Sequence, residues 1–288
     1  MNEFNSAPLD PPGQPQKLGR LLICVVALGL IAVIAPRGSL QAQMLLPVVP
    51  VVYDYDVVER VAQPRQNFVQ GLQIVGDTLY VSTGMYGESR LREYAFPSME
   101  LRRERSLPDS VFGEGVTRLN DKLYQLTWRA GRMLEYDAST MKLLRSHVIP
   151  TEGWGITDNN SDLIYSDGTP QLYFLDPNTL QRRRTLNVTL NGTPLPRLNE
   201  LEWIDGEIWA NVFQANQLVR INPTSGFVTA VIDLRGLLAP EDYADDTDVL
   251  NGIAWDAAES ALWVTGKRWP WIFRVRLKER SASPSATQ

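Results

Sequence analysis

Residues 71–82 read GLQIVGDTLYVS, and this stretch decides the fold that the sequence predicts. Two short runs of strand-forming residues lie on either side of Gly76-Asp77, a pair that favours a tight turn. Aromatic and β-branched residues such as Tyr80 and Val81 suit a pleated, half-buried strand. We therefore expect two antiparallel strands joined by a turn at this place.

The same pattern recurs four more times along the chain. The copies are GVTRLNDKLYQL (residues 115–126), GITDNNSDLIYS (155–166), LEWIDGEIWAN (201–211) and GIAWDAAESALWVT (252–265). A further strand-like run follows most copies, and repeats of roughly 40–50 residues with about four strands each are typical of propeller blades. Each small sheet in such a ring covers the face of its neighbour. We predict an all-β chain whose residues 51–277 form a five-bladed β-propeller.

The strand expected at residues 57–61 is predicted to pair with the last repeat and close the ring. Closure removes the sheet edges that would otherwise invite aggregation. A β-sandwich is the competing fold, but a sandwich predicts no five-fold repeat.

The two ends of the chain differ in composition from the repeats. Residues 1–16 are polar and rich in proline, which predicts a disordered tail. Residues 17–43 begin with basic side chains and continue with the uncharged apolar run 21–35, the pattern of a signal peptide or signal anchor. We expect an exported protein, periplasmic or secreted, either released by cleavage or held at the membrane by that run. Residues 278–288 are rich in serine and alanine and are predicted to be a second disordered tail.

Composition excludes several classes of function. The chain has 28 Lys and Arg against 33 Asp and Glu, and this net charge of −5 argues against nucleic-acid binding. Its one cysteine, Cys24, lies in the apolar run, so the repeats can form neither a disulfide nor a cysteine metal site. Its one histidine, His147, cannot build a histidine-rich metal site. We expect no cofactor, no metal in the site and a monomeric protein.

The residues just before the first strand of each repeat should meet at one rim of the central channel. Loops at equivalent places converge there, and binding residues are often carried by such loops. A purely structural ring would not need polar and aromatic residues at this place in every repeat. Gln70, Glu114, Trp154 and Asn251 directly precede the first residue of their copies, and Asn199 lies two residues before the first residue of its copy.

These residues belong to a set of motifs that resembles the glutaminyl-peptide cyclotransferases of the plant and bacterial type. The matching segments are FVQGL (68–72), STGMYGES (82–89), FGEGVT (112–117), LTW (126–128), EGWGI (152–156), SDG (166–168), LNELE (198–202), IWANV (208–212), VLNGIA (249–254) and VTGKRWP (264–270). The resemblance covers all five repeats. It implies a five-bladed propeller that converts the N-terminal glutamine of peptides and proteins to pyroglutamate and releases ammonia without zinc.

Glu114 is the predicted acid/base group, because it matches the glutamate to which the family assigns that role. In the cyclisation the substrate's own amine attacks its side-chain amide carbon, so no covalent enzyme intermediate is needed. One carboxylate suffices to take a proton from the amine and give it to the departing nitrogen. Nearby aromatic side chains would raise the pKa of Glu114 by excluding water. The alternative is a glutamate that satisfies backbone donors in a turn.

Three amide side chains are further candidates. Gln70 and Asn251 can hold the substrate carbonyl or the developing oxyanion, and Asn199 can hold the substrate backbone. For all three, a turn-stabilising bond to the local backbone is the alternative.

Aromatic side chains are expected to form the walls of the substrate pocket. Trp128 and Trp154 are the main candidates, and core packing between repeats is their alternative role. The related enzymes often carry a tryptophan where this chain has Phe213. Phenylalanine keeps an apolar wall but lacks the indole N–H donor, so substrate preference is expected to differ.

Lys267 is expected either to stabilise negative charge in the site or to pair with Glu200 or Glu202 across the channel. The complete predicted substrate-binding set is Phe68, Gln70, Phe112, Trp128, Trp154, Asn199, Phe213, Asn251 and Lys267.

Two other functions remain open from the sequence. One is a non-catalytic exported propeller that binds peptides or envelope partners, and the other is a sugar- or lactone-hydrolysing propeller. The second would need a metal held by several carboxylates, and no ligand spacing here supports a specific metal. The intact FGEG segment at residues 112–115 favours the cyclotransferase.

Overall fold

The computed structural model describes residues 49–281. The predictions for residues 1–16 and 17–43, and for the last residues of the chain, lie outside this part. Its regular structure is β-sheet apart from one short 3-10 helix, η1 (Pro240–Asp242). Within the described residues no helix has the length and apolar character needed to cross a membrane.

Most of the strands form antiparallel sheets of four, each built from consecutive segments. The first sheet is β2 (Val69–Val75), β3 (Thr78–Thr83), β4 (Arg90–Ala95) and β5 (Glu100–Ser106). The second is β6 (Gly113–Leu119), β7 (Lys122–Thr127), β8 (Arg132–Asp137) and β9 (Leu143–Val148). The third is β10 (Ile156–Asp158), β11 (Leu163–Ser166), β12 (Gln171–Leu175) and β13 (Arg182–Asn187). A small hairpin, β14 (Thr189–Leu190) and β15 (Thr193–Pro194), follows the third sheet.

The remaining strands form one eight-stranded sheet. Its order is β16 (Leu198–Ile204), β17 (Glu207–Val212), β18 (Gln217–Ile221), β19 (Val228–Asp233), β1 (Val51–Ala62), β22 (Trp271–Glu279), β21 (Ala261–Gly266) and β20 (Leu250–Asp256). Strand β1 joins the two halves, because it pairs parallel with β19 and antiparallel with β22. The predicted pairing of an early strand with the last repeat is therefore confirmed.

The predicted hairpins also form where the sequence places them. Their turns use residues with positive φ, among them Gly76 at 61°, Asn120 at 57° and Gly206 at 83°. Two-residue turns whose residues have positive φ match the right-handed twist of antiparallel strands. Local turn chemistry thus determines where each first strand ends and each second strand begins.

One predicted boundary is wrong. Strand β22 continues to Glu279, so residues 278 and 279 are paired and do not belong to a tail. The reason is the N-terminal half of β1, which offers both a free edge and two carboxylates. Lys278 lies opposite Asp54 and donates to the carboxylate of Asp56 at 2.8 Å.

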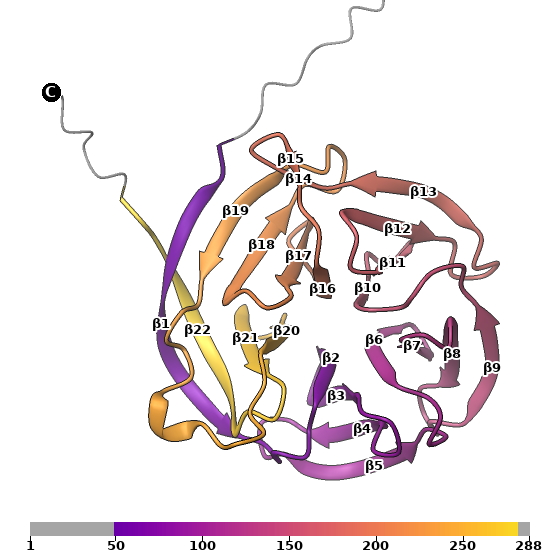
Figure 1. Cartoon of the computed structure of the whole chain (residues 1–288). Helices are drawn as coiled ribbons and strands as arrows, with labels where there is room; N and C mark the ends of the chain where they lie inside the picture. The colour runs from indigo at the N-terminus through magenta and orange to yellow at the C-terminus, as the bar shows by residue number, and fades with distance from the viewer. Residues whose placement is uncertain (1–48, 282–288) are drawn as a thin grey trace, which may run out of the picture. The chain divides into compact units, whose positions relative to one another are not determined.

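Figure 1 shows the sheets standing around a common centre, with β2, β6, β10, β16 and β20 innermost. Each of these strands contacts the next, and β20 contacts β2. Glycines allow this close approach. A Cβ added to Gly71 would lie 2.4 Å from the backbone nitrogen of Val116, and one on Gly155 would lie 2.0 Å from the carbonyl oxygen of Asn199. The repeated glycines of the sequence are therefore the points where neighbouring inner strands meet.

The apolar core lies between adjacent sheets. One cluster packs Leu72 of β2 against Ala254 and Trp263 of the neighbouring sheet, and another packs Phe174 against Ile208. Burial of such side chains contributes roughly 1.5–3 kcal/mol each. The core thus holds the ring together and fixes the inner strands in place.

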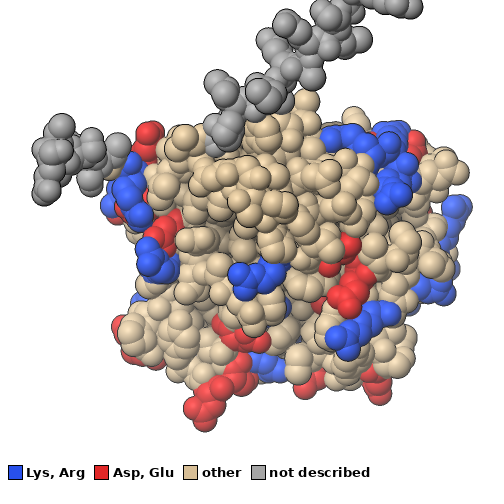
Figure 2. Space-filling model, turned by 45° about the horizontal axis from the view of Figure 1, so that its top comes forward, with Lys and Arg blue, Asp and Glu red and all other residues tan. Residues whose placement is uncertain are grey.

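Charged side chains cover the outside of the ring. On the face in Figure 2, positive and negative side chains are interspersed around a broad uncharged area. Two arginines of the outer strand β5 are paired with acids, in Arg102–Asp77 and Arg103–Glu93. Charges on an outer strand discourage pairing with other chains.

Candidate active site

A bend recurs at the start of the inner strands. The pairing register shifts between Val69 and Gly71 in β2 and between Gly113 and Val116 in β6, and the same happens in β16 and β20. Such bulges re-aim the side chains of the residues they contain. The residues at these bulges are Gln70, Glu114, Asn199 and Asn251. Four of the five residues that the sequence analysis placed at the entry of each repeat therefore occupy equivalent positions in the structure.

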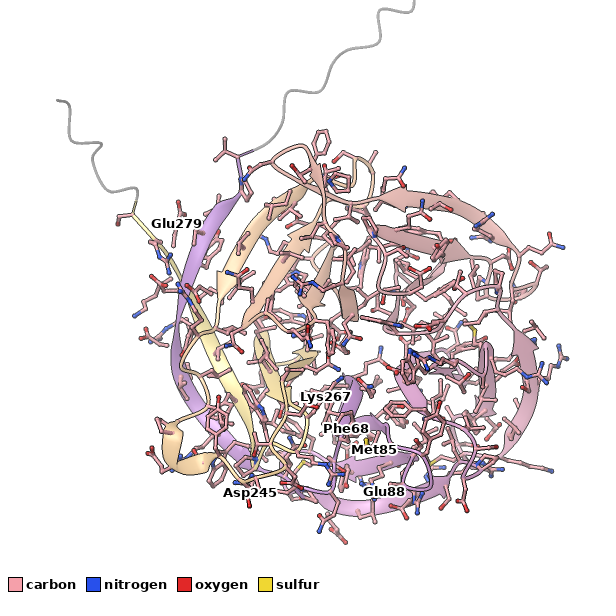
Figure 3. All side chains as sticks on the ribbon, in the orientation of Figure 1. Phe68, Met85, Glu88, Asp245, Lys267 and Glu279 are labelled. Atoms are coloured by element: carbon pink, nitrogen blue, oxygen red, sulfur yellow. The ribbon has the colours of Figure 1, made fainter. Side chains whose placement is uncertain are left out.

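A cavity of about 270 Å³ opens at this end of the inner strands. Its lining contains every predicted site residue except Asn251, and it adds Met85 and Asp248. The lining residues are Phe68, Gln70, Met85, Phe112, Glu114, Trp128, Trp154, Asn199, Phe213, Asp248 and Lys267. Phe68, Met85 and Lys267 lie near one another beside the inner end of β2 (Figure 3).

One wall of the cavity is a row of aromatic rings. Phe112 meets Phe68 edge to face at 6.2 Å between centroids and Trp128 at 5.5 Å. On its outer side Phe112 also meets the half-exposed Tyr86 at 5.4 Å. Edge-to-face pairs of this kind favour one fixed arrangement of the rings. The wall is therefore apolar and rigid.

Lys267 also lines the cavity. Its Nζ lies 5.0 Å from the ring centroids of both Phe68 and Phe213, and Phe213 in turn meets Trp154 at 5.6 Å. Cations are attracted to aromatic faces at this range. Burial lowers the pKa of Lys267, while the carboxylates of Glu114 and Asp248 act in the opposite direction.

Glu152 is a site residue that the sequence prediction missed. Its Oε2 accepts from the indole N–H of Trp128 at 2.7 Å and from that of Trp154 at 3.1 Å. Arg129 approaches the other oxygen at 3.6 Å and stacks on Trp128 at 4.0 Å. One carboxylate thus fixes both tryptophans. The sequence could have indicated Glu152, because it is the first residue of the EGWGI motif at residues 152–156.

Glu114 lies at the base of the cavity with only 4% of its surface exposed. The side-chain amide of Gln70 donates to its Oε1 at 3.2 Å, and among residues 49–281 no hydrogen bond is made to Oε2. Burial raises the pKa of Glu114 well above its ordinary value; Lys267 opposes this shift and Glu152 adds to it. The result is a carboxyl group with one oxygen held and the other available to a ligand.

Asn251 does not line the cavity, contrary to the prediction of a direct substrate contact. Its Nδ2 donates to the backbone oxygen of Val69 at 3.0 Å and to Oε1 of Gln70 at 3.2 Å. Asn251 therefore lies behind Gln70 and orients it. Because Gln70 accepts from Asn251, its own amino group must face Glu114.

Asn199 does line the cavity. It is 2% exposed, and its side-chain Oδ1 has no hydrogen-bond partner among the described residues. A buried acceptor of this kind is suited to a donor on a ligand.

The alternative pairing of Lys267 with Glu200 or Glu202 does not form. Glu200 accepts from the backbone N–H groups of Leu72 at 3.3 Å and Ile253 at 2.8 Å. Glu202 accepts from the N–H of Trp255 at 3.1 Å. Both carboxyl groups therefore tie β16 to other inner strands, Glu200 to β2 and β20 and Glu202 to β20. Across residues 49–281, His, Cys, Asp and Glu side chains form no group of three or more arranged to hold a metal.

Comparison with known proteins agrees with this geometry. A family model described as Glutamine cyclotransferase matches residues 26–277. A glutaminyl-peptide cyclotransferase of Arabidopsis thaliana is 38% identical over 237 residues, which cover 80% of this chain and 73% of that protein. The crystal structure of Myxococcus xanthus glutaminyl cyclase superposes with a TM-score of 0.75 at 30% identity, over 81% of this chain and 100% of the other. The chain belongs to the glutamine cyclotransferase family.

Proposed function

We propose that this protein is a glutaminyl-peptide cyclotransferase, an acyltransferase that converts the N-terminal glutamine of peptides and proteins to pyroglutamate. The observation that carries the proposal is Glu114, a buried carboxyl group with one oxygen held by Gln70 and the other available in an aromatic cavity. Membership of the family supports the same activity.

The chemistry needs one group that both accepts and donates a proton. The neutral α-amine of the substrate attacks its own side-chain amide carbon, and a C–N bond forms while the carbonyl oxygen gains negative charge. Glu114 takes the proton from the attacking amine and delivers it to the amide nitrogen. The bond to that nitrogen then breaks and ammonia leaves, so Glu114 ends in its starting state. A raised pKa suits a carboxyl group to both transfers.

The other lining residues supply charge and confinement. The Lys267 ammonium and the second amide N–H of Gln70 lie where they can stabilise the developing oxyanion. Oδ1 of Asn199 accepts from a donor on the substrate backbone. The aromatic walls hold the glutamine side chain in a folded, cyclisable conformation and exclude water. Because the chain itself supplies acid, base and charge, the reaction is proposed to be metal-independent.

We also propose that the ring has five blades and acts as a monomer. On this reading the eight-stranded sheet is two blades, β16–β19 and β20–β22 with β1, fused through the parallel pairing of β1 with β19. The circular contacts of the inner strands support this count. A single species at the mass of one chain in light scattering is expected.

Export is a separate proposal that rests on the apolar run at residues 21–35. Fractionation of producing cells should place the protein outside the cytoplasm, and the mass of its N-terminal peptide would show whether the run is cleaved or retained as an anchor.

Ammonia release from a dipeptide that begins with glutamine tests the function directly. We expect turnover by the wild-type protein, equal turnover with a strong chelator, and none with the N-acetylated peptide, whose amine cannot attack. Binding of the dipeptide without ammonia release would support a non-catalytic propeller instead. Loss of turnover with the chelator would overturn the metal-independent step.

A further inference from the structure

Asn211 is a buried polar residue that the proposed mechanism does not use. It lies in β17 and has no exposed surface. Its Oδ1 accepts from the backbone N–H of Gly252 at 3.0 Å, across to the neighbouring inner strand β20. This bond ties the bulge of β20 to the strand beside it.

The bulge at Gly252 needs such support. Its backbone has a φ of 125°, a conformation that favours glycine, and a Cβ there would lie 2.9 Å from Cγ2 of Thr265. A tight, fully buried bend leaves its N–H without water, so an internal acceptor is required. Asn211 provides that acceptor.

A continuous chain of hydrogen bonds leads from this bend to Glu114. Asn251 directly precedes Gly252, and its amide donates to Oε1 of Gln70 at 3.2 Å. Gln70 donates in turn to Oε1 of Glu114, also at 3.2 Å. Asn211, Asn251, Gln70 and Glu114 come from four different inner or neighbouring strands, and all four are buried.

The direction of each bond in this chain is determined. The oxygen of Asn211 must face the N–H of Gly252. If the side-chain amide were turned over, its amino group would point at that N–H, and two donors would face each other. For the same reason Asn251 must present its amino group to the carbonyl oxygen of Val69. These constraints leave Gln70 only one orientation, with its amino group toward Glu114.

We propose that Asn211 is a positioning residue for the cyclisation, which sets the bulge of β20 and, through Asn251 and Gln70, the oxygen of Glu114 that faces the substrate. The inference rests on the proposed cyclotransferase function. Asn211 touches neither the cavity nor the substrate, so it acts on the rate of proton transfer and not on binding. It lies in the IWANV segment, whose role the site residues do not explain.

Asn211→Leu tests the proposal, because leucine is close in size and removes the acceptor. In the full-length protein, with a glutamine-initiated dipeptide, we expect kcat to fall by roughly 10- to 100-fold, as displacements of about 1 Å do. We expect KM to stay within about twofold, because the cavity lining is intact. The acid limb of the pH profile of kcat/KM should move to higher pH. A displaced Gln70 no longer donates to Glu114, and loss of that hydrogen bond disfavours the charged form of Glu114 and raises its pKa.

Gln73→Leu is the matched control. Gln73 also accepts a backbone N–H from a neighbouring sheet, that of Arg118 at 2.6 Å, but it lies at the far end of the inner strands. A comparable loss of stability is expected from it, with kcat and the pH profile unchanged. The same kinetic change in both variants would mean a general structural effect and would overturn the proposal.

Asn211→Asp keeps an oxygen facing Gly252 and is expected to recover most of the lost kcat. If Asn211→Leu does not fold, Asn211→Ala is assayed with the same expectations. Wild-type kcat and pH profile in the Leu or Ala variant would overturn the inference, as would an aspartate variant as slow as leucine. A wild-type protein that releases no ammonia would instead overturn the proposed function.

Discussion

The two ends of the inner strands both bury carboxyl groups, but they use them differently. At the cavity end, Glu114 has one oxygen held by a side-chain amide and the other available to a ligand. Glu200, one residue beyond the cavity-lining Asn199, and Glu202, further along the channel, instead accept backbone N–H bonds from β2 and β20. Burial raises the pKa of all three well above the ordinary value. A raised pKa therefore does not by itself mark a catalytic carboxyl group, whereas an available oxygen in an open cavity does.

The surroundings of the two ends reinforce this difference. The cavity end is lined by five aromatic side chains and includes the cation Lys267. The far end is lined by polar and charged side chains, including Gln73, Arg118 and Asp158, with Trp203 and Trp255 beside them. Apolar walls keep water from a reactive carboxyl group. Glu202 at the far end is as buried as Glu114, so the two carboxyl groups differ in their partners and not in their exposure.

The largest expected effect separates Glu114 from Glu200. Glu114→Gln removes the proton shuttle and should lower kcat by roughly 10²- to 10⁴-fold while the protein stays folded. Glu200→Gln removes an equally buried carboxyl group and should leave most of the activity. Ammonia release and circular dichroism on both variants check this. Equal losses would break the distinction between these two buried carboxyl groups, and a fully active Glu114→Gln protein would overturn its assigned role.

Lys267→Met should have the next largest effect. Loss of this cation removes charge stabilisation at the cavity end, and kcat/KM should fall by about 100-fold. Lys267 lowers the pKa of Glu114, so without it that pKa rises and the acid limb of the pH–rate profile should move to higher pH.

Lys122→Met is the matched control for charge, because Lys122 pairs with Glu135 at 2.8 Å away from the cavity. An unshifted acid limb in Lys267→Met would show that Lys267 does not act on Glu114.

Glu200→Gln should also change the pH dependence of stability. The raised pKa means that the folded state holds this proton more tightly than the unfolded state does. The stability it contributes is fully present below the ordinary value of 4.5 and is lost as the pH rises through the raised value. The glutamine variant loses one acceptor, at a cost of about 1–3 kcal/mol.

The free-energy gap between wild type and Glu200→Gln should therefore be largest near pH 4.5 and shrink as the pH rises. Urea unfolding at a series of pH values measures it. A gap that widens with pH would mean that Glu200 is ionised in the folded protein.

Phe213→Trp should have the smallest effect. Tryptophan enlarges the ring that meets Trp154 and Lys267 and restores an indole N–H at the wall of the cavity. An aromatic contact is worth about 0.5–1.5 kcal/mol, so KM should change by no more than about tenfold, with kcat kept. Dipeptides with different second residues would show whether preference changes. A large fall in kcat would place Phe213 closer to the reacting atoms than the cavity wall suggests.

Much of the site was predictable because its residues follow the repeat. Gln70, Glu114 and Asn199 lie at the start of their inner strands and Trp154 just before its own, and the structure brings all four to one cavity. Asn251 lies at the start of its inner strand too, yet its amide turns toward Gln70 and Val69. The repeat locates a residue along a strand, but the bulge decides where its side chain points.

The sequence by itself determined the hairpins, their repetition and the residues of the inner rim, because alternation and turn chemistry are properties of neighbouring residues. Only the tertiary structure decided which buried carboxyl group keeps an available oxygen. That choice depends on backbone donors and amides from other strands, and those partners are far away along the chain. Glu200 meets Leu72 and Ile253 only when the ring closes, and Glu114 meets Gln70 and Lys267 for the same reason.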